Sequence, residues 1–328
     1  MERVNMKAKN RFVFIILIIG ALTFLPVAGL AVTIDPFYAG SYTAIDLGSA
    51  PGVPPLYGPV LLKAGDPNTL LIGGNANNAP GALWAIGVNR DAGNHITGFS
   101  GTATRFADAA YNDGGAQYGP GGVLFLARWP VNQIGQTLPG SSITDKVVDM
   151  APLGVASSAA ALAFVPPGFP GAGQLKLVSW SGGEWYTLAF SPDGTGTYNI
   201  TSATQNTTLG GGPEGIAYVP LGSALFPNPS ILQCEYSANK VATYEVDANG
   251  DPIVATRRDF ITDLTGAEGA FIDPLTGDFL FSTFGGGDCI VEVQGFVTPP
   301  PIPIPPTMLL FGSGLAALIG FGRKFKMT

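Results

Sequence analysis

The sequence predicts an all-β fold: a β-propeller of about five blades, with six as the alternative, closed by an N-terminal strand. Three observations predict it. The 328 residues include 46 glycines and 28 prolines, which disfavour helices. Hydrophobic residues make up 46% of the chain, which is too many for a disordered protein. The central part of the chain also repeats a unit rich in short apolar segments.

The repeat is clearest in two copies. One begins Gly-Pro-Glu-Gly-Ile-Ala at 212–217, and the other begins Gly-Ala-Glu-Gly-Ala-Phe at 266–271. Each copy continues with two further apolar segments, 231–236 and 241–246 in the first, 279–284 and 289–293 in the second. Weaker copies begin near Gly58, Gly119 and Ser158. The unit predicts three or four short antiparallel strands, and sheets of this kind repeated around a ring form a propeller.

The ends of the repeat array predict how the ring closes. The last repeat ends near Phe296 without an outer strand, whereas the segment 42–47 reads as a strand that belongs to no repeat. We expect this segment to pair with the last blade. The Gly-Pro-x-Gly-Ile-Ala pattern at 212–217 resembles NHL-type propeller repeats. A pair of β-sandwiches or a β-helix is the alternative architecture.

The N-terminus has the three parts of a secretory signal. Basic residues from Arg3 to Arg11 precede an uncharged apolar run from Phe12 to about Leu25, and small residues lead up to Ala31. The run is shorter than the roughly 20 residues that span a bilayer. We therefore expect a signal helix that is cleaved after Ala31, with an uncleaved anchor as the alternative.

The C-terminus is organised in a similar way. A proline-rich linker covers 297–307, an apolar segment predicted to form a short helix runs from Met308 to Phe321, and basic residues close the chain. By the positive-inside rule, that end would hold the segment in the membrane with its tail in the cytoplasm. The sequence thus predicts four parts: a signal peptide (1–31), a propeller (32–296), a linker (297–307) and a sorting or transmembrane segment (308–328).

The tail resembles the PEP-CTERM sorting signal of Gram-negative bacteria, in which Pro-Glu-Pro precedes Ser or Thr, a Leu-rich run with Gly-Ser-Gly-Leu, and basic residues. The matching positions are Pro303, Pro305, Thr307, Gly312, Gly314, Arg323 and Lys324. Ile304 stands where the family has Glu. The resemblance implies processing by an exosortase-like sorting enzyme and carries no activity.

The charge of the mature body restricts its partners. The end segments hold 7 of the 16 basic residues and one acidic residue, so 32–306 has 9 basic and 22 acidic residues, a net charge of −13. Phosphate contacts need basic side chains, which excludes nucleic acid as the expected partner. An acidic body is compatible with divalent cations, basic ligands or solubility outside the cell.

Two cysteines are too few to be the framework of the fold. In an oxidising compartment Cys234 and Cys289 could form a disulfide. Two free buried thiols are the alternative.

The candidate site residues are Glu214 and Glu268, which occupy the same place in the two clearest repeats, where the innermost strand begins near the central channel. They could share a Ca²⁺ ion or act as an acid/base pair. They could also bond to the backbone of neighbouring blades, which would be a structural role.

The single histidine and a group of aromatic residues are further candidates. His95 is the one histidine of the chain, and without a Gly-x-Ser-x-Gly elbow or further metal ligands at set spacing it is expected to be an ordinary exposed residue. Trp129, Trp180, Trp185 and Tyr186 could line a sugar-binding face or belong to the core.

These observations predict an exported envelope or extracellular-matrix propeller that binds protein or polysaccharide without catalysis. No catalytic residue and no cofactor is expected, apart from Ca²⁺ at Glu214 and Glu268. The alternative is a Ca²⁺-dependent propeller hydrolase or lactonase.

Overall fold

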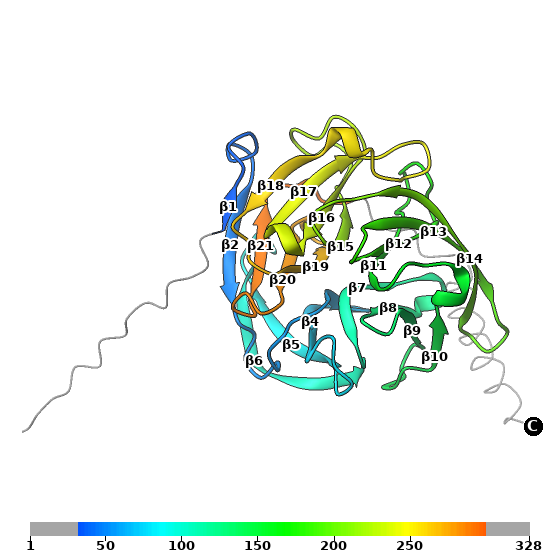
Figure 1. Ribbon diagram of the computed structural model, residues 1–328. Coiled ribbons are helices and arrows are strands. Elements are labelled where there is room, and N and C mark those ends of the chain that lie inside the picture. Colours follow the sequence, from blue (N-terminus) through cyan, green and yellow to red (C-terminus); the bar gives the residue numbers. More distant parts are fainter. Residues whose placement is uncertain (1–31, 300–328) are drawn as a thin grey trace, which may run out of the picture.

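Five antiparallel sheets stand around a central axis in the computed structural model, which describes residues 32–299 (Figure 1). Blade 1 contains β3–β6, blade 2 contains β7–β10 and blade 3 contains β11–β14. Blade 4 combines β15–β18 with β1, and blade 5 combines β19–β21 with β2. The predicted propeller is thus confirmed, with five blades rather than six.

The strands are short and few helical turns separate them. The strands are β1 (Thr33–Ile34), β2 (Thr43–Gly48), β3 (Val60–Lys63), β4 (Asp66–Gly74), β5 (Ala82–Arg90), β6 (Ile96–Asp108), β7 (Asn112–Tyr118), β8 (Leu124–Arg128), β9 (Gln133–Thr137), β10 (Lys146–Asp149), β11 (Ala159–Phe164), β12 (Leu175–Ser179), β13 (Glu184–Pro192), β14 (Tyr198–Thr208), β15 (Pro213–Tyr218), β16 (Ser230–Glu235), β17 (Lys240–Glu245), β18 (Arg258–Thr262), β19 (Ala267–Ile272), β20 (Phe279–Thr283) and β21 (Ile290–Gln294). Four single-turn 3₁₀ helices are η1 (Pro120–Gly122), η2 (Ala151–Leu153), η3 (Tyr236–Ala238) and η4 (Val254–Thr256).

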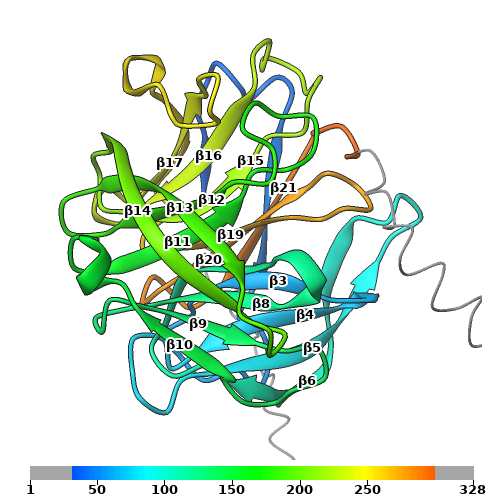
Figure 2. The ribbon, with the colours of Figure 1, turned by 90° about the vertical axis from the view of Figure 1, so that its right-hand side faces the viewer.

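The innermost strands β3, β7, β11, β15 and β19 contact one another around the axis. Figure 2 shows the strands of blades 1 and 2 in its lower half and those of blades 3 and 4 in its upper half. The innermost strands are buried on both faces, as in β15, where all six residues are buried. This explains why β3 and β11 are near-continuous apolar runs without alternation. The outer strand β10, by contrast, has an exposed face with Val147 and Asp149.

Glycines let the innermost strands approach the axis closely. A Cβ atom on Gly215 would lie 2.4 Å from the backbone nitrogen of Ala270 in the next blade. A Cβ atom on Gly115 would lie 2.4 Å from the backbone nitrogen of Leu162. Any larger residue at these positions would push two blades apart.

The core lies between blades rather than within one of them. Five buried clusters correspond to the five blade interfaces. Between blades 4 and 5, for example, Val241 and Phe260 pack with Phe279 and Phe281. Because each blade buries its faces only against its neighbours, the loss of one blade would expose two of these cores.

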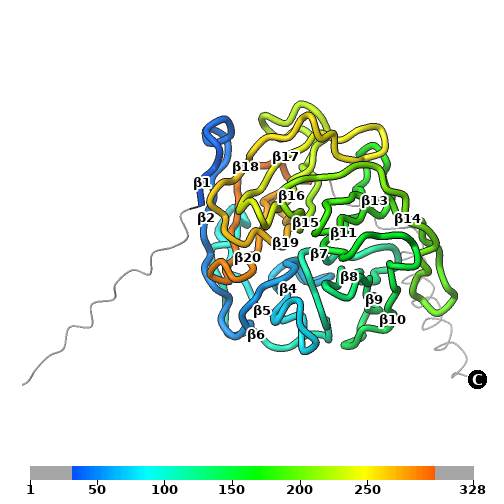
Figure 3. The backbone as a smooth tube through the Cα atoms, in the orientation of Figure 1, coloured from blue at the N-terminus to red at the C-terminus, as the bar shows by residue number. Residues whose placement is uncertain are grey.

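The N-terminal strand closes the ring as predicted. Strand β2 pairs with β21 antiparallel, with Thr43 opposite Gln294, so the start and the end of the propeller share blade 5 (Figure 3). The sequence did not predict the second N-terminal strand, β1, which adds to the edge of β18 in blade 4. Tyr38 and Tyr42, between these strands, are buried against Phe226 and Phe260.

The sequence repeats match the blades with one error. The copies near Gly58 and Ser158 correspond to blades 1 and 3, but the predicted start of the copy near Gly119 is one strand too late. Gly119 precedes η1 and the second strand, β8, whereas the innermost strand of blade 2 is β7, at Asn112–Tyr118.

The disulfide considered for Cys234 and Cys289 is not formed, because both thiols are free and buried. Cys234 lies on β16 with its Sγ 3.7 Å from the oxygen of Gly269, and Cys289 lies beside Thr283 in blade 5. Both thiols belong to the buried core between blades 4 and 5.

Some predictions lie outside the described residues. They are the signal helix in 1–31, the linker from 300 onward, the apolar helix of 308–328 and the whole sorting motif. Within 32–299, no helix is long and apolar enough to cross a membrane.

Candidate functional site

Three innermost strands carry an acidic residue followed by glycine inside a β-bulge. Asp113 lies in the irregular part of β7, Glu214 in that of β15 and Glu268 in that of β19. A bulge leaves residues out of the regular pairing and can re-aim a side chain. In the corresponding irregularity of β11 the residue is Ala160, so blade 3 contributes no charge.

The three carboxylates converge on one point. Asp113, Glu214 and Glu268 each offer an oxygen atom, and these oxygens all lie within 4.8 Å of one another. The residues are 1%, 4% and 2% exposed. No hydrogen bond of good geometry reaches either oxygen of Asp113, Oε2 of Glu214 or Oε1 of Glu268. Buried charge of this density requires compensation by protons or by a cation.

Burial and mutual repulsion hold protons on these groups in the absence of a cation. Burial raises the pKa of Asp113 to about 7, although the nearby Glu268 carboxyl, Asn77 amide and Gly114 N–H lower it. Burial, followed by the charge of Asp113, raises the pKa of Glu214 well above its usual value. Burial, followed by the charge of Glu214, does the same for Glu268.

A ring of half-buried side chains, here called the collar, surrounds a cavity of about 180 Å³ whose lining includes Glu214 and Glu268. Each blade contributes one collar residue from the loop after its second strand. The collar consists of Asn77, Trp129, Trp180, Tyr236 and Phe284.

Adjacent collar rings meet edge to face. The ring centroids of Trp129 and Trp180 are 6.2 Å apart, those of Trp180 and Tyr236 6.4 Å, and those of Tyr236 and Phe284 6.0 Å. Interplanar angles of 68° to 79° make all three pairs T-shaped. The site is therefore an acidic floor surrounded by an aromatic wall.

The structure brings Glu214 and Glu268 together at the channel, where the sequence placed them. Sequence reasoning missed Asp113, because the copy in blade 2 was aligned on Gly119. The acidic-glycine pair Asp113-Gly114 matches Glu214-Gly215 and would have given the correct alignment. Glu214 does make a hydrogen bond within its own blade, but through its backbone. Its backbone oxygen accepts a hydrogen bond from Nε2 of Gln233 on β16, at 2.6 Å.

The aromatic residues singled out in the sequence divide into two groups. Trp129 and Trp180 belong to the collar. Trp185 and Tyr186 are buried in the core, 0% and 3% exposed.

A second cluster of titratable groups lies between blades 1 and 5. The expectation that His95 is an ordinary exposed residue is wrong, because its Nδ1 lies 2.6 Å from Oδ2 of the buried Asp278. Glu292 completes the cluster, and its Oε1 accepts from the N–H of Ile96. A neighbouring ion pair also connects blades 1 and 5, because Nη1 of Arg90 lies 2.6 Å from Oδ2 of Asp273.

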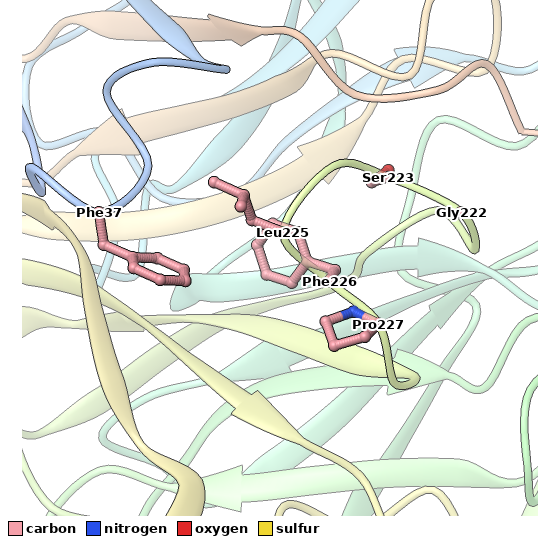
Figure 4. Close-up of a pocket in the computed structure, with 6 residues that line it drawn as sticks. All are labelled: Phe37, Gly222, Ser223, Leu225, Phe226 and Pro227. Carbon is pink, nitrogen blue, oxygen red and sulfur yellow. The ribbon is translucent and has the colours of Figure 1, made fainter.

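A larger hollow of about 500 Å³ lies elsewhere on the surface, with mainly apolar lining (Figure 4). Phe37, Leu225, Phe226 and Pro227 form much of it, and the hydroxyl of Ser223 is committed to the oxygen of Pro220. Its lining includes no titratable side chain, so the candidate functional site is the channel mouth.

Fold and site together define a five-bladed β-propeller with an acidic channel mouth. No family model matches the sequence, and no curated protein matches it significantly. Solved structures are similar in fold. A Trichoderma reesei protein of carbohydrate-active enzyme family AA12 is 11% identical with a TM-score of 0.51, over 83% of this chain and 99% of that one.

Two further structures are less similar. The PQQ domain of a pyranose dehydrogenase from Coprinopsis cinerea is 9% identical with a TM-score of 0.44, over 81% of this chain and 97% of that one. A Thermus thermophilus protein described as a putative oxidoreductase (glucose dehydrogenase) is 10% identical with a TM-score of 0.44, over 77% of this chain and all of that one. These similarities show the propeller fold alone.

Proposed function

We propose that this chain is an exported, non-catalytic binding protein that captures a cation in the mouth of its propeller channel. One observation carries the proposal: the carboxylates of Asp113, Glu214 and Glu268 are buried together, and both oxygens of Asp113 and one oxygen of each glutamate have no hydrogen bond of good geometry. A cation would stabilise the ionised form of all three. The ends of the chain support export through a signal peptide and envelope sorting through a PEP-CTERM-like tail.

The spacing of the oxygens suits a divalent metal ion, with Ca²⁺ as the simplest occupant. Calcium binds oxygen ligands at about 2.3–2.6 Å, so two ligands on opposite sides of one ion lie about 5 Å apart. The three carboxylate oxygens lie within 4.8 Å of one another. Oδ1 of Asn77, which has no hydrogen-bond donor, is a fourth oxygen in the lining of the cavity. Water would complete the coordination, as it commonly does for this ion.

The cofactor named for the pyranose dehydrogenase domain, PQQ, does not fit this mouth. PQQ is itself a tricarboxylate, and the charged residues that line the cavity are Glu214 and Glu268. Like charges would repel it, because no Lys or Arg lies in that lining to compensate. We therefore infer no quinone chemistry at this site.

A Ca²⁺-dependent hydrolase or lactonase is the second candidate, and one observation favours it. With its pKa raised to about 7, Asp113 could exchange a proton near neutral pH. The cavity opposes this reading, because its lining places no histidine, serine or lysine beside Glu214 and Glu268 as a nucleophile or general base.

Thermal unfolding with and without metal tests the proposal. We expect Ca²⁺ to raise the melting temperature of the parent, chelator to reverse this, and the double variant Glu214→Gln with Glu268→Gln to abolish the response. At a hundredfold excess over its dissociation constant, a ligand stabilises by about 2.7 kcal/mol. The variant Glu245→Gln, outside the channel on β17, is the matched control and should respond like the parent.

The outcomes separate the candidates. A parent that contains no metal by elemental analysis, and whose unfolding does not respond to Ca²⁺, Mn²⁺ or Zn²⁺, would mean that protons alone neutralise the carboxylates. Metal-dependent turnover of a chromogenic ester or a lactone, lost in Asp113→Asn, would establish the hydrolase instead.

A further inference from the structure

A metal site does not need the aromatic side chains that form the wall of the channel mouth. Four of the five collar residues are aromatic, and the side-chain oxygens of the collar are the amide oxygen of Asn77 and the hydroxyl of Tyr236. Ca²⁺ prefers six to eight oxygen ligands, whereas aromatic rings offer none. The rings instead offer the negative faces of their π-systems, which attract a cation within about 6 Å of the ring centroid.

Ring packing keeps the wall in place. The edge-to-face contacts run continuously from Trp129 through Trp180 and Tyr236 to Phe284, so each ring is supported by its neighbour. Because one ring comes from each of four blades, the propeller itself fixes their spacing. Such a preformed wall orders few side chains when a ligand binds, which favours affinity.

Charge and size restrict the occupant further. The floor carries up to three negative charges and no hydrogen-bond donor satisfies Oε2 of Glu214 or Oε1 of Glu268. The ionised floor repels an anionic ligand and attracts a cationic one. The cavity of about 180 Å³ also exceeds the space of one metal ion, since a water molecule has a share of about 30 Å³. A bare ion would leave much of the aromatic wall in contact with water alone.

We propose that the channel mouth binds an alkylated ammonium group, with its positive charge over Glu214 and Glu268 and its alkyl groups against the rings of Trp129, Trp180, Tyr236 and Phe284. Aromatic rings around a cation are the recognised means of binding quaternary ammonium groups. The inference rests on the proposed function, that the mouth captures a cation, and names the class of cation. Because both occupants would use the same carboxylates, alkylammonium and Ca²⁺ should compete.

Choline and its uncharged isostere 3,3-dimethyl-1-butanol are the probes that test this, together with tetramethylammonium. Binding to chelator-treated protein is measured by titration calorimetry and by tryptophan fluorescence, since Trp129 and Trp180 lie in the wall. We expect choline and tetramethylammonium to bind and to shift the fluorescence, and 3,3-dimethyl-1-butanol to bind at least about tenfold more weakly. Added Ca²⁺ should weaken choline binding.

Variants locate the binding. Trp180→Leu should weaken choline binding about tenfold, the order expected for losing one desolvated cation–π contact. The matched control is Trp84→Leu, which changes a half-buried tryptophan on β5 outside the collar. Choline affinity of this control should equal that of the parent. Glu214→Gln should weaken the binding of both choline and Ca²⁺.

Every other outcome contradicts the inference, or both the inference and the proposed function. If Ca²⁺ stabilises the protein but choline and tetramethylammonium do not bind, the inference is wrong and the cation-binding function stands. If neither Ca²⁺ nor the alkylammonium ions bind, the inference and the cation-binding function are both wrong. Equal binding of choline and its uncharged isostere, or equal loss in Trp84→Leu and Trp180→Leu, would also overturn the inference.

Discussion

Nδ1 of His95 lies 2.6 Å from Oδ2 of Asp278, so the one histidine of the chain connects blade 1 to blade 5. His95 belongs to the turn between β5 and β6, and Asp278 precedes β20. The hydrogen bond with Asp278 raises the pKa of His95. A protonated histidine therefore favours the folded state, and this contribution is lost as the pH rises through the raised pKa.

The first prediction is that the stability lost in His95→Gln is larger at pH 5.5 than at pH 8.5. The expected cost at the lower pH is about 1 kcal/mol, since the imidazole is partly exposed. Chemical denaturation of parent and variant at both pH values measures it. Arg90→Gln removes the neighbouring ion pair with Asp273, which contains no histidine, so its cost should change little between these pH values. A pH-independent cost for His95→Gln would contradict the prediction. Glu292 titrates in the same window, with its pKa raised to about 7, so the comparison is between parent and variant at each pH.

The second prediction concerns the buried carboxylates in metal-free protein. The pKa of Asp113 rises from 3.8 to about 7 on folding, so the folded state binds this proton more tightly than the unfolded state. That contribution is fully present below the unfolded pKa and is lost as the pH rises through 7. We expect the parent to be less stable at pH 8 than at pH 5.5, by a few kcal/mol.

Asp113→Asn should flatten this pH dependence, because the amide does not titrate. Saturating cation should restore the stability of the parent at pH 8 but have a smaller effect on the variant. Denaturation of both proteins at several pH values measures the change. If Asp113→Asn unfolds with the same pH profile as the parent, Asp113 does not carry the effect.

The third prediction is that deletion of residues 32–48 destabilises the propeller and causes association. The deletion removes β2 from β21 and β1 from β18, which exposes unpaired strand edges. It also removes Tyr38 and Tyr42 from the core between blades 4 and 5. Melting temperature and size-exclusion chromatography report the outcome. A deletion variant as stable and monomeric as the parent would show that ring closure does not depend on this segment.

The fourth prediction is export and processing at both ends. Mass spectrometry of the mature protein should find an N-terminus near Val32. Where the sorting enzyme accepts Ile304, the basic C-terminus should also be lost. Replacing Ile304 by Glu restores the residue of the family pattern and should increase that processing. Full-length protein that retains Met1 in envelope fractions would contradict cleavage of the signal peptide.

The sequence by itself determined the propeller and its closure, because these depend on local patterns. Short apolar strands, turns and repeat spacing are readable one segment at a time. The unpaired segment 42–47 predicted β2 for the same reason, since a strand without a partner had one open edge to fill. The repeat also placed Glu214 and Glu268 at equivalent positions beside the channel.

Only the tertiary structure decided what surrounds those two glutamates. Asp113 joins them, and the collar lies around them, because a closed ring brings one position of each blade to the axis whatever its separation along the chain. Tryptophans at strand ends look alike in the sequence, yet Trp180 faces the cavity and Trp185 is in the core. The contact of His95 with Asp278 likewise depends on how two blades meet. Local sequence fixes which strands form, whereas the packing of blades against one another fixes which side chains share a site.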